Sequence, residues 1–263
     1  MTHDNTTHRN LLEVCAGDIE SVYAASRGEA QRVELCSALA DGGITPSTGF
    51  IRQAVRVPGM KVHVLIRPRG GDFLYTPEEV ASMTDDIVAA REAGAHGVVI
   101  GALTPDGDID MDACRQMMEA ASGMNVTFHR AFDLCRDPFE ALDHIIALGC
   151  NRLLTSGQAA SALDGAPMLR QLVDRAAGRL VVLAGGGVCP QNAAEIIRLS
   201  GTCEIHASAR HTIASHMIYR KPGVSMGAPG TDEYALGSPL FKKVTINLEN
   251  GNKMVIEAPD NDA

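Results

Sequence analysis

The sequence has 263 residues, of which 45% are hydrophobic and 21% are charged, the composition of a globular protein that can bury a substantial core. The net charge of −9, from 23 basic and 32 acidic residues, argues against a general nucleic-acid-binding protein. Apolar runs stay well short of the roughly 20 residues that cross a bilayer. The first ten residues are polar and lack the apolar region of a signal peptide, so we expect a disordered tail over residues 1–10 of a cytoplasmic protein.

Seven cysteines are spread along the chain, an odd number without a C-x-x-C pair. Their spacing gives no disulfide framework and excludes the usual zinc-finger and iron–sulfur patterns. We therefore expect most of the cysteines to be small buried hydrophobic residues.

Short β-rich runs alternate with helical patterns from residue 11 to residue 210. The clearest helix is TPEEVASMTDDIVAAREAG, with Thr76 as its N-cap, Pro77 at its first position and Gly94 just past its end. Two further helical segments end on Gly149 and Gly201 in the same way. The expected strands, in chain order, are LLEVCAG, RVELCSAL, KVHVLIRPR, GVVIGAL, NVTFHRAFD, RLLTSG, LVVLAGGGV and EIHASAR.

Eight strands, several of them almost continuously apolar and each but the last followed by a helix, are typical of a (β/α)8 TIM barrel. A doubly wound open sheet is the alternative, but it usually has fewer strands and a glycine-rich fingerprint after the first strand, and this chain has no such fingerprint. We therefore predict an eight-stranded parallel barrel over residues 11–220.

The C-terminal segment does not follow this alternation. Residues 221–239 are rich in Gly, Ser and Pro and predict a loop. The stretch FKKVTINLENGNKMVIEAP then alternates apolar and polar residues around Asn250 and Gly251, a strong hairpin signal. Residues 221–263 are thus predicted to form a loop plus a hairpin-like extension, which could be a surface ribbon, an oligomer contact or a fusion remnant.

In a barrel, the helix-facing side of each strand must be apolar, so charged residues within a strand must face the barrel axis. On the fifth strand His129 and Arg130 have opposite parities, and the pattern of Thr127, His129 and Asp133 favours His129 as the inward residue. The side chains predicted to face inward on the other strands are those of Glu13, Cys15, Glu34, Cys36, His63, Arg67, Glu204, His206, Ser208 and Arg210.

Burying so many ionisable groups is costly unless they pair or bind a ligand. Glu13 and Glu34 come early in their strands and suit an interior ion-pair network. Arg67, His129 and Arg210 come late, at the end of the barrel where active sites form, and are expected to contact a ligand. An anion, such as a phosphate, is favoured by the hydroxyls of LTSG, including Ser156, and by the glycines of AGGGV, including Gly186.

The motifs VELC, IRPRGGDF, TFHRAFD, LTSG and GGGV resemble those of the CutC copper homeostasis family. The resemblance runs from about Leu11 to Arg210, with a weaker trace in SMGAPGTDEY. It implies a TIM barrel, a cytoplasmic and often dimeric protein, a link to copper tolerance, and copper ligands at Cys15 and Cys36. The hairpin-like end departs from the family, whose chains normally finish with a helix after the D-E-Y segment.

Two functions remain open from the sequence. Cys15 and Cys36 lie on neighbouring strands, with Cα atoms about 5 Å apart, and two soft thiolates suit Cu(I), with His63 as a third donor. Neighbouring acids oppose thiolate formation, and the two cysteines could simply fill space. The alternative is an enzyme acting on a small anionic or phosphorylated metabolite, with His129 or His206 as general acid/base and Glu13, Glu34, Arg67, Asp133, Ser156, Gly186 and Arg210 as further ligand contacts.

Overall fold

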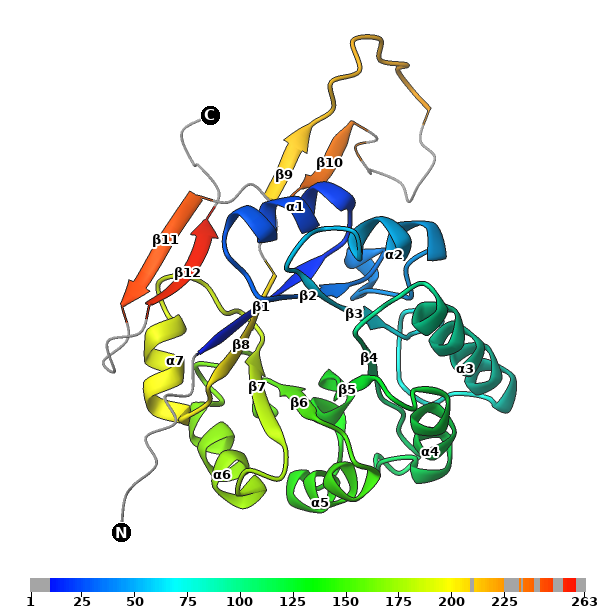
Figure 1. Ribbon diagram of the computed structural model, residues 1–263, viewed down its shortest axis with the longest axis vertical. Helices are drawn as coiled ribbons and strands as arrows, with labels where there is room; N and C mark the ends of the chain where they lie inside the picture. The colour runs from blue at the N-terminus through cyan, green and yellow to red at the C-terminus, as the bar shows by residue number, and fades with distance from the viewer. Residues whose placement is uncertain are drawn as a thin grey trace.

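The computed structural model describes residues 10–208, 211–224, 232, 234–238, 242–247 and 253–258. Eight parallel strands close into a barrel in the order β1 to β8, with β8 paired to β1, and helices surround it (Figure 1). This confirms the predicted TIM barrel. The strands are β1 (Leu11–Ala16), β2 (Arg32–Leu35), β3 (Lys61–Leu65), β4 (Gly97–Ile100), β5 (Asn125–Phe128), β6 (Arg152–Thr155), β7 (Val181–Gly185) and β8 (Glu204–Ala207).

The helices begin and end at residues that provide hydrogen bonds or backbone conformations suited to the free N–H and C=O groups of the terminal turns. Helix α3 starts with a capping box, in which Thr76 and Glu79 each accept the other's backbone N–H. Gly149 and Gly201 end α5 and α7 at φ +83° and +73°, left-handed values that glycine adopts readily. The helices are α1 (Ile19–Arg27), α2 (Thr48–Ala54), α3 (Pro77–Glu92), α4 (Met111–Ala120), α5 (Pro138–Leu148), α6 (Ala166–Ala176) and α7 (Ala193–Ser200), with 3-10 turns η1 (Leu39–Asp41) and η2 (Arg130–Leu134).

The two faces of the strands differ as the alternation predicts. Residues such as Val14, Val33 and Val62 belong to the large apolar core that packs the strands against the helices. The alternate residues face the barrel axis, where Cys36, Leu65 and Val99 form a separate small cluster. The inward side chains therefore include seven that we predicted: Glu13, Cys15, Glu34, Cys36, His63, Arg67 and His206.

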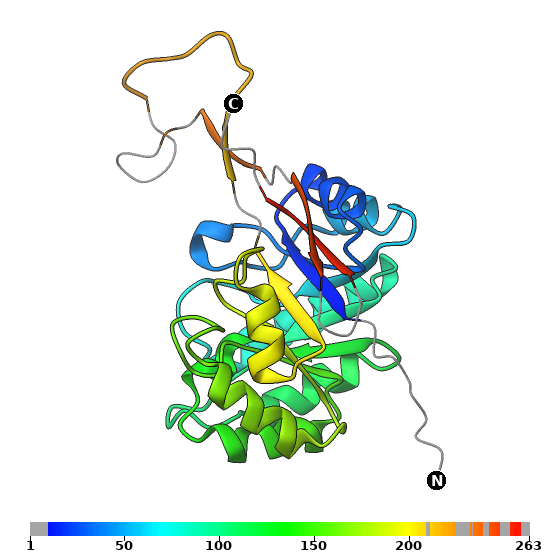
Figure 2. The same ribbon diagram turned by 90° about the vertical axis from the view of Figure 1, so that its left-hand side faces the viewer.

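Beyond the barrel, β9 (His211–Ala214) pairs antiparallel with β10 (Ala235–Ser238) and forms an arm that projects from the barrel (Figures 1 and 2). Its exposed residues include Ile218 and Tyr219. The prediction of a loop over residues 221–239 was therefore wrong for β10, because residues 235–238 gain ladder hydrogen bonds from β9 that local composition does not reveal.

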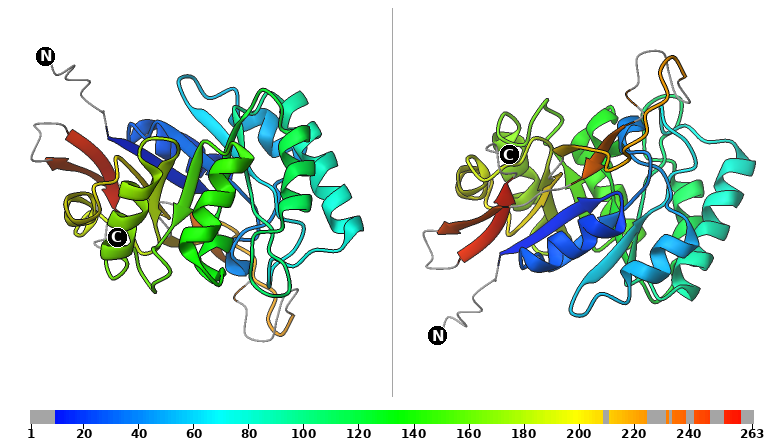
Figure 3. Two further views of the ribbon diagram at one scale, coloured as in Figure 1. Left: turned by 90° about the horizontal axis from the view of Figure 1, so that it is seen from below. Right: turned by 90° about the horizontal axis from the view of Figure 1, so that it is seen from above.

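The last two strands, β11 (Lys242–Asn247) and β12 (Lys253–Ala258), pair antiparallel. This agrees with the hairpin signal, although its turn at Asn250 and Gly251 lies outside the described residues, as do residues 1–9 of the tail predicted over residues 1–10. The strand pair lies against the outside of the barrel, with β12 beside β1 and β11 beside α7 (Figure 3). Over the described segments, no helix is long and apolar enough to cross a membrane.

Candidate functional site

The interior side chains converge from neighbouring strands. In the backbone register Glu13 of β1 lies opposite His206 of β8, and Cys15 lies opposite Glu34 of β2. Glu34 in turn lies opposite His63 of β3. The acids, thiols and imidazoles that the sequence placed on separate strands are thus adjacent in the closed barrel.

Cys15 and Cys36 meet in the barrel interior, where their Sγ atoms are 3.3 Å apart. Both are free thiols, and Cys36 is fully buried. The hydrogen bond with Cys36, burial and the charge of Glu34 together raise the pKa of Cys15 well above its ordinary value. Cys15 is therefore protonated near neutral pH.

His206 lies between two carboxylates. Its Nδ1 is 2.8 Å from Glu13 Oε1, and its Nε2 is 3.7 Å from Glu34 Oε2. Burial lowers the pKa of His206, but hydrogen bonds with Cys15 and Glu13 and the charges of both carboxylates outweigh this and raise it well above its usual value. One potential ligand atom from each of Cys15, Glu34 and His206 lies within 4.8 Å of the others. The structure thus places His206 beside the thiols, where the sequence suggested His63.

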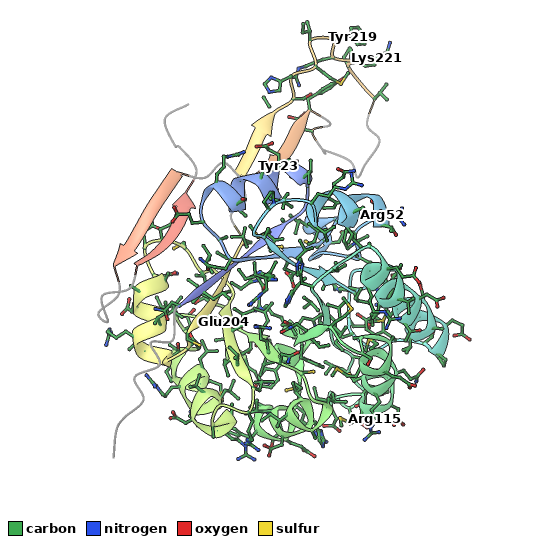
Figure 4. The ribbon with its side chains drawn as sticks, in the orientation of Figure 1. Tyr23, Arg52, Arg115, Glu204, Tyr219 and Lys221 are labelled. Carbon is green, nitrogen blue, oxygen red and sulfur yellow. The ribbon has the colours of Figure 1, made fainter. Side chains whose placement is uncertain are left out.

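An ion-pair network occupies the amino-terminal end of the barrel interior. Arg32 donates from Nε to Glu13 and from Nη2 to Glu204, and Arg152 donates to Glu204 over 2.8 Å (Figure 4 labels Glu204). Burial raises the pKa of Glu13, but the charge of Arg32 and the hydrogen bond with His206 hold it well below its usual value. Arg32 was missed among the candidate residues, although it shares the strand face of Glu34 and Cys36.

His63 does not belong to the thiol cluster. It lines a cavity of about 300 Å³ at the amino-terminal end of the barrel, beside the ion-pair network. Burial, reinforced by the charges of Arg32 and Arg152, lowers the pKa of His63 to about 3. The neighbouring residue on β4 is Gly97, and a Cβ at this position would lie 2.7 Å from the His63 ring. The absence of a side chain at Gly97 therefore makes room for the imidazole inside the barrel. His63 is therefore a neutral interior residue.

A cavity of about 100 Å³ opens at the carboxyl-terminal end of the strands. Arg67 and His129 both line it, as predicted for residues late in their strands. Arg130, which the parity argument set aside in favour of His129, lines it as well. The complete lining is Glu34, Gly42, Leu65, Arg67, Phe73, His129, Arg130 and Leu154.

The sequence suggested that Asp133 contacts a ligand, whereas in the structure its carboxylate binds groups of the protein itself. Its carboxylate accepts hydrogen bonds from the backbone N–H groups of Ser156 and Gln158 and from the hydroxyls of Thr155 and Ser156. It also pairs with Arg130 over 2.7 Å. The donors after β6 that could bind an anion therefore already hold a carboxylate of the protein itself.

Two predicted ligand contacts remain, Gly186 and Arg210. Gly186 has φ +107°, and a Cβ there would lie 3.1 Å from the Ser156 side chain and 3.4 Å from the Arg130 guanidinium carbon. Gly186 thus allows the turn after β7 to approach these side chains. Arg210 lies outside the described residues.

Gly101 of the β4 end makes room for His129, because a Cβ at this position would lie 2.5 Å from two atoms of the imidazole. We expect Gly101→Ala to destabilise the protein by about 1–3 kcal/mol, the usual cost of overpacking a core. Chemical denaturation measures the change. Gly49 on α2 is the control, since its nearest atom would be 3.9 Å away and alanine suits a helix better. Equal stability of Gly101→Ala and Gly49→Ala would contradict the packing argument.

The fold and the interior together define a TIM-barrel protein whose axis carries an ion-pair network, a pair of adjacent thiols and a cavity at the carboxyl-terminal mouth. The model of the CutC family matches residues 10–211. The chain therefore belongs to the CutC family, as its sequence motifs suggested.

Relatives support this membership over most of the chain. A CutC family protein of Chromobacterium violaceum is 53% identical, covering 86% of this chain and 91% of its own length. The copper homeostasis protein cutC homolog of Homo sapiens is 47% identical and covers 93% and 90%. The crystal structure of CutC from Streptococcus agalactiae is 35% identical, with a TM-score of 0.72, and covers 75% of this chain and 97% of that one.

The segment after the barrel matches a different family model. Residues 212–263 match the glycosyl hydrolase family 92 catalytic domain. This match begins at β9, where the CutC match ends, so the family membership of the chain rests on the barrel.

Proposed function

We propose that this protein binds Cu(I) inside the barrel through Cys15 and Cys36, and that copper is its cargo in copper homeostasis. The observation that carries this proposal is the pair of interior thiols with Sγ atoms 3.3 Å apart. Thiolates are soft ligands that select Cu(I) over hard cations. A human relative named as a copper homeostasis protein, 47% identical to this chain, supports the same reading.

The surroundings of the thiols suit a soft metal ion with a third donor. His206 offers Nε2 on the side of Cys15 and Glu34, while its Nδ1 is held by the Glu13 carboxylate. A carboxylate behind a histidine is the common way in which proteins orient a metal-ligating imidazole. We therefore propose His206, rather than His63, as the third donor, with Cys36 and Cys15 as the first two.

The protons on these groups set how binding depends on pH. The raised pKa values of Cys15 and His206 mean that both hold a proton near neutral pH, and a metal must displace it. Uptake of Cu(I) is therefore expected to release protons, and the apparent affinity is expected to rise with pH, by about ten-fold per pH unit for each proton released. Cu(I) titration in weak buffer at several pH values measures both quantities.

Purified, reduced protein is expected to take Cu(I) from a competing chelator, and the Cys15→Ser/Cys36→Ser double variant is expected to lose this uptake. Serine preserves the size of the side chain but replaces a soft donor with a hard one. The control is Cys114→Ser/Cys150→Ser, which changes two buried cysteines outside this cluster. Equal uptake by the Cys15→Ser/Cys36→Ser variant, with an unchanged circular dichroism spectrum, would refute the site. The cytoplasmic location and the dimeric state stay predictions from the sequence.

A further inference from the structure

The cavity at the mouth of the barrel has an apolar side and a polar side. Leu65, Phe73 and Leu154 form the apolar side, while Arg67, His129, Arg130 and Glu34 provide the polar groups. The copper proposal uses neither Arg67 nor His129, so both groups need a separate explanation.

His129 presents a hydrogen-bond donor that lacks a partner among the described residues. Its Nδ1 accepts the backbone N–H of Ala131 over 3.2 Å, so the proton of the neutral imidazole lies on Nε2. Burial, followed by the charge of Arg67, lowers the pKa of His129 to about 3. Nε2 is buried and makes no hydrogen bond within the described part of the chain. A buried donor of this kind is costly unless a ligand accepts its hydrogen bond.

Arg67 gives the cavity a positive charge that the described residues do not neutralise. Its guanidinium donates to the backbone carbonyls of Asp41, Gly43 and Gly71, and lies 4.9 Å from the centre of the Phe73 ring. No carboxylate of the described residues forms an ion pair with it. Carbonyl oxygens satisfy donors but carry no net charge. The second cation at the cavity, Arg130, is already paired with Asp133.

We propose that this cavity binds a small organic monocarboxylate, whose carboxylate accepts from His129 and faces Arg67 while its short apolar part contacts Leu65, Phe73 and Leu154. One uncompensated cation matches one negative charge. A phosphate dianion suits the cavity less well, since Glu34 is part of the lining and a phosphate offers nothing to the apolar side. The β6 loop donors that would suit a phosphate are occupied by Asp133.

This assignment changes the role that the sequence suggested for His129. A neutral imidazole that already uses Nδ1 as an acceptor donates a hydrogen bond and is a poor proton acceptor near neutral pH. His129 therefore holds a ligand in place instead of removing its proton. The proposed copper donors Cys15, Cys36 and His206 are absent from the cavity lining, although Glu34, which lies beside His206, is part of it.

The test uses copper-free, reduced, full-length protein and a series of probe anions at constant ionic strength. Acetate, propionate and lactate are expected to raise the melting temperature in a saturable way, as a ligand of the native state does. Chloride is expected to give no saturable rise, and sulfate and phosphate only the unsaturable rise of salts that are excluded from the protein surface. Isothermal titration gives the dissociation constants. No saturable effect from any carboxylate, or an equal effect from chloride, would overturn the proposal.

Two variants of His129 separate the donor from the fold. His129→Asn keeps a side-chain oxygen near Nδ1 to accept from Ala131 but has no N–H at the position of Nε2, whereas His129→Gln can extend an N–H towards that position. We expect Asn to weaken carboxylate binding at least about ten-fold, as for loss of a hydrogen bond to a charged group, and Gln to restore part of it. Unchanged binding by Asn, or equal loss in both variants, would overturn the role of His129.

The Cys15→Ser/Cys36→Ser variant distinguishes this proposal from the copper proposal. It is expected to bind carboxylate like the parent protein while it loses Cu(I) uptake. If carboxylates bind and copper does not, the copper proposal alone fails. If copper binds and carboxylates do not, the carboxylate site fails.

Discussion

Arg32→Met is expected to destabilise the protein by about 3–5 kcal/mol, the cost of leaving buried charge without its partner. Arg32 is 2% exposed and donates to both Glu13 and Glu204. Methionine has a similar length but no charge, so among the described ion pairs Glu13 keeps the one with His206 and Glu204 keeps the one with Arg152. Urea denaturation near neutral pH measures the change.

An exposed ion pair provides the control for the effect of Arg32→Met on stability. Arg27 and Glu20 form an exposed pair at 2.7 Å, and Arg27→Met is expected to change the free energy of unfolding by less than about 1 kcal/mol, because water screens exposed charges. The combination Arg32→Met/Glu13→Gln is expected to recover part of the loss, since it removes a stranded carboxylate together with its partner. If Arg32→Met and Arg27→Met cost the same, the interior network contributes nothing specific.

When the pH falls from about 7 to about 4.5, the parent protein is expected to lose about 2.5 kcal/mol more stability than the His129→Asn variant loses. The pKa of His129 is about 3 in the folded protein but about 6.5 in the unfolded chain. Below about pH 6.5 the unfolded state of the parent therefore binds an extra proton and gains in stability relative to the folded state. Asparagine does not titrate, so the variant lacks this contribution.

Other groups titrate in the same range, and the comparison of variants removes their effects. The raised pKa of His206 acts in the opposite direction, but it is common to the parent and to His129→Asn. Replacing the exposed His216 with asparagine is the matched control for the loss of an imidazole. Denaturant titrations at each pH provide the free energies. Parallel curves for the parent and His129→Asn would show that His129 is not neutral in the folded state.

The fold could be predicted from the sequence because its determinants are local and repetitive. The eight apolar runs and helix signals such as Thr76, Pro77 and Gly149 specify the alternation of strand and helix. The inward face followed from one rule, that charged groups on a buried strand cannot face the helix layer, and it placed Glu13, Glu34 and five further interior residues correctly. Ser208, which was also predicted to face inward, is exposed. Strand β10 was missed because its pairing partner lies across a loop.

The candidate site was only partly predictable, because its chemistry depends on distances across the barrel and on loop geometry. Parity put Cys15 and Cys36 on the inner face, but only the closed barrel brings His206 of the last strand beside Cys15. Asp133 could not be distinguished from a ligand contact, since its donors come from a loop more than 20 residues away. The donor at Nε2 of His129 follows from a turn in which Ala131 N–H occupies Nδ1, and no spacing of residues reveals this tautomer.

The closure of β8 onto β1 has a consequence for how the chain is made. Arg32 and Glu204 are 172 residues apart, so at a synthesis rate of about 5–20 residues per second the ribosome needs roughly 10–35 s to deliver the second after the first. During that interval Glu13 and Arg32 lack the partners that β8 supplies, and the edge of β1 is open to pairing with other chains. The barrel can therefore close only after β8 has emerged, late in the synthesis of the chain.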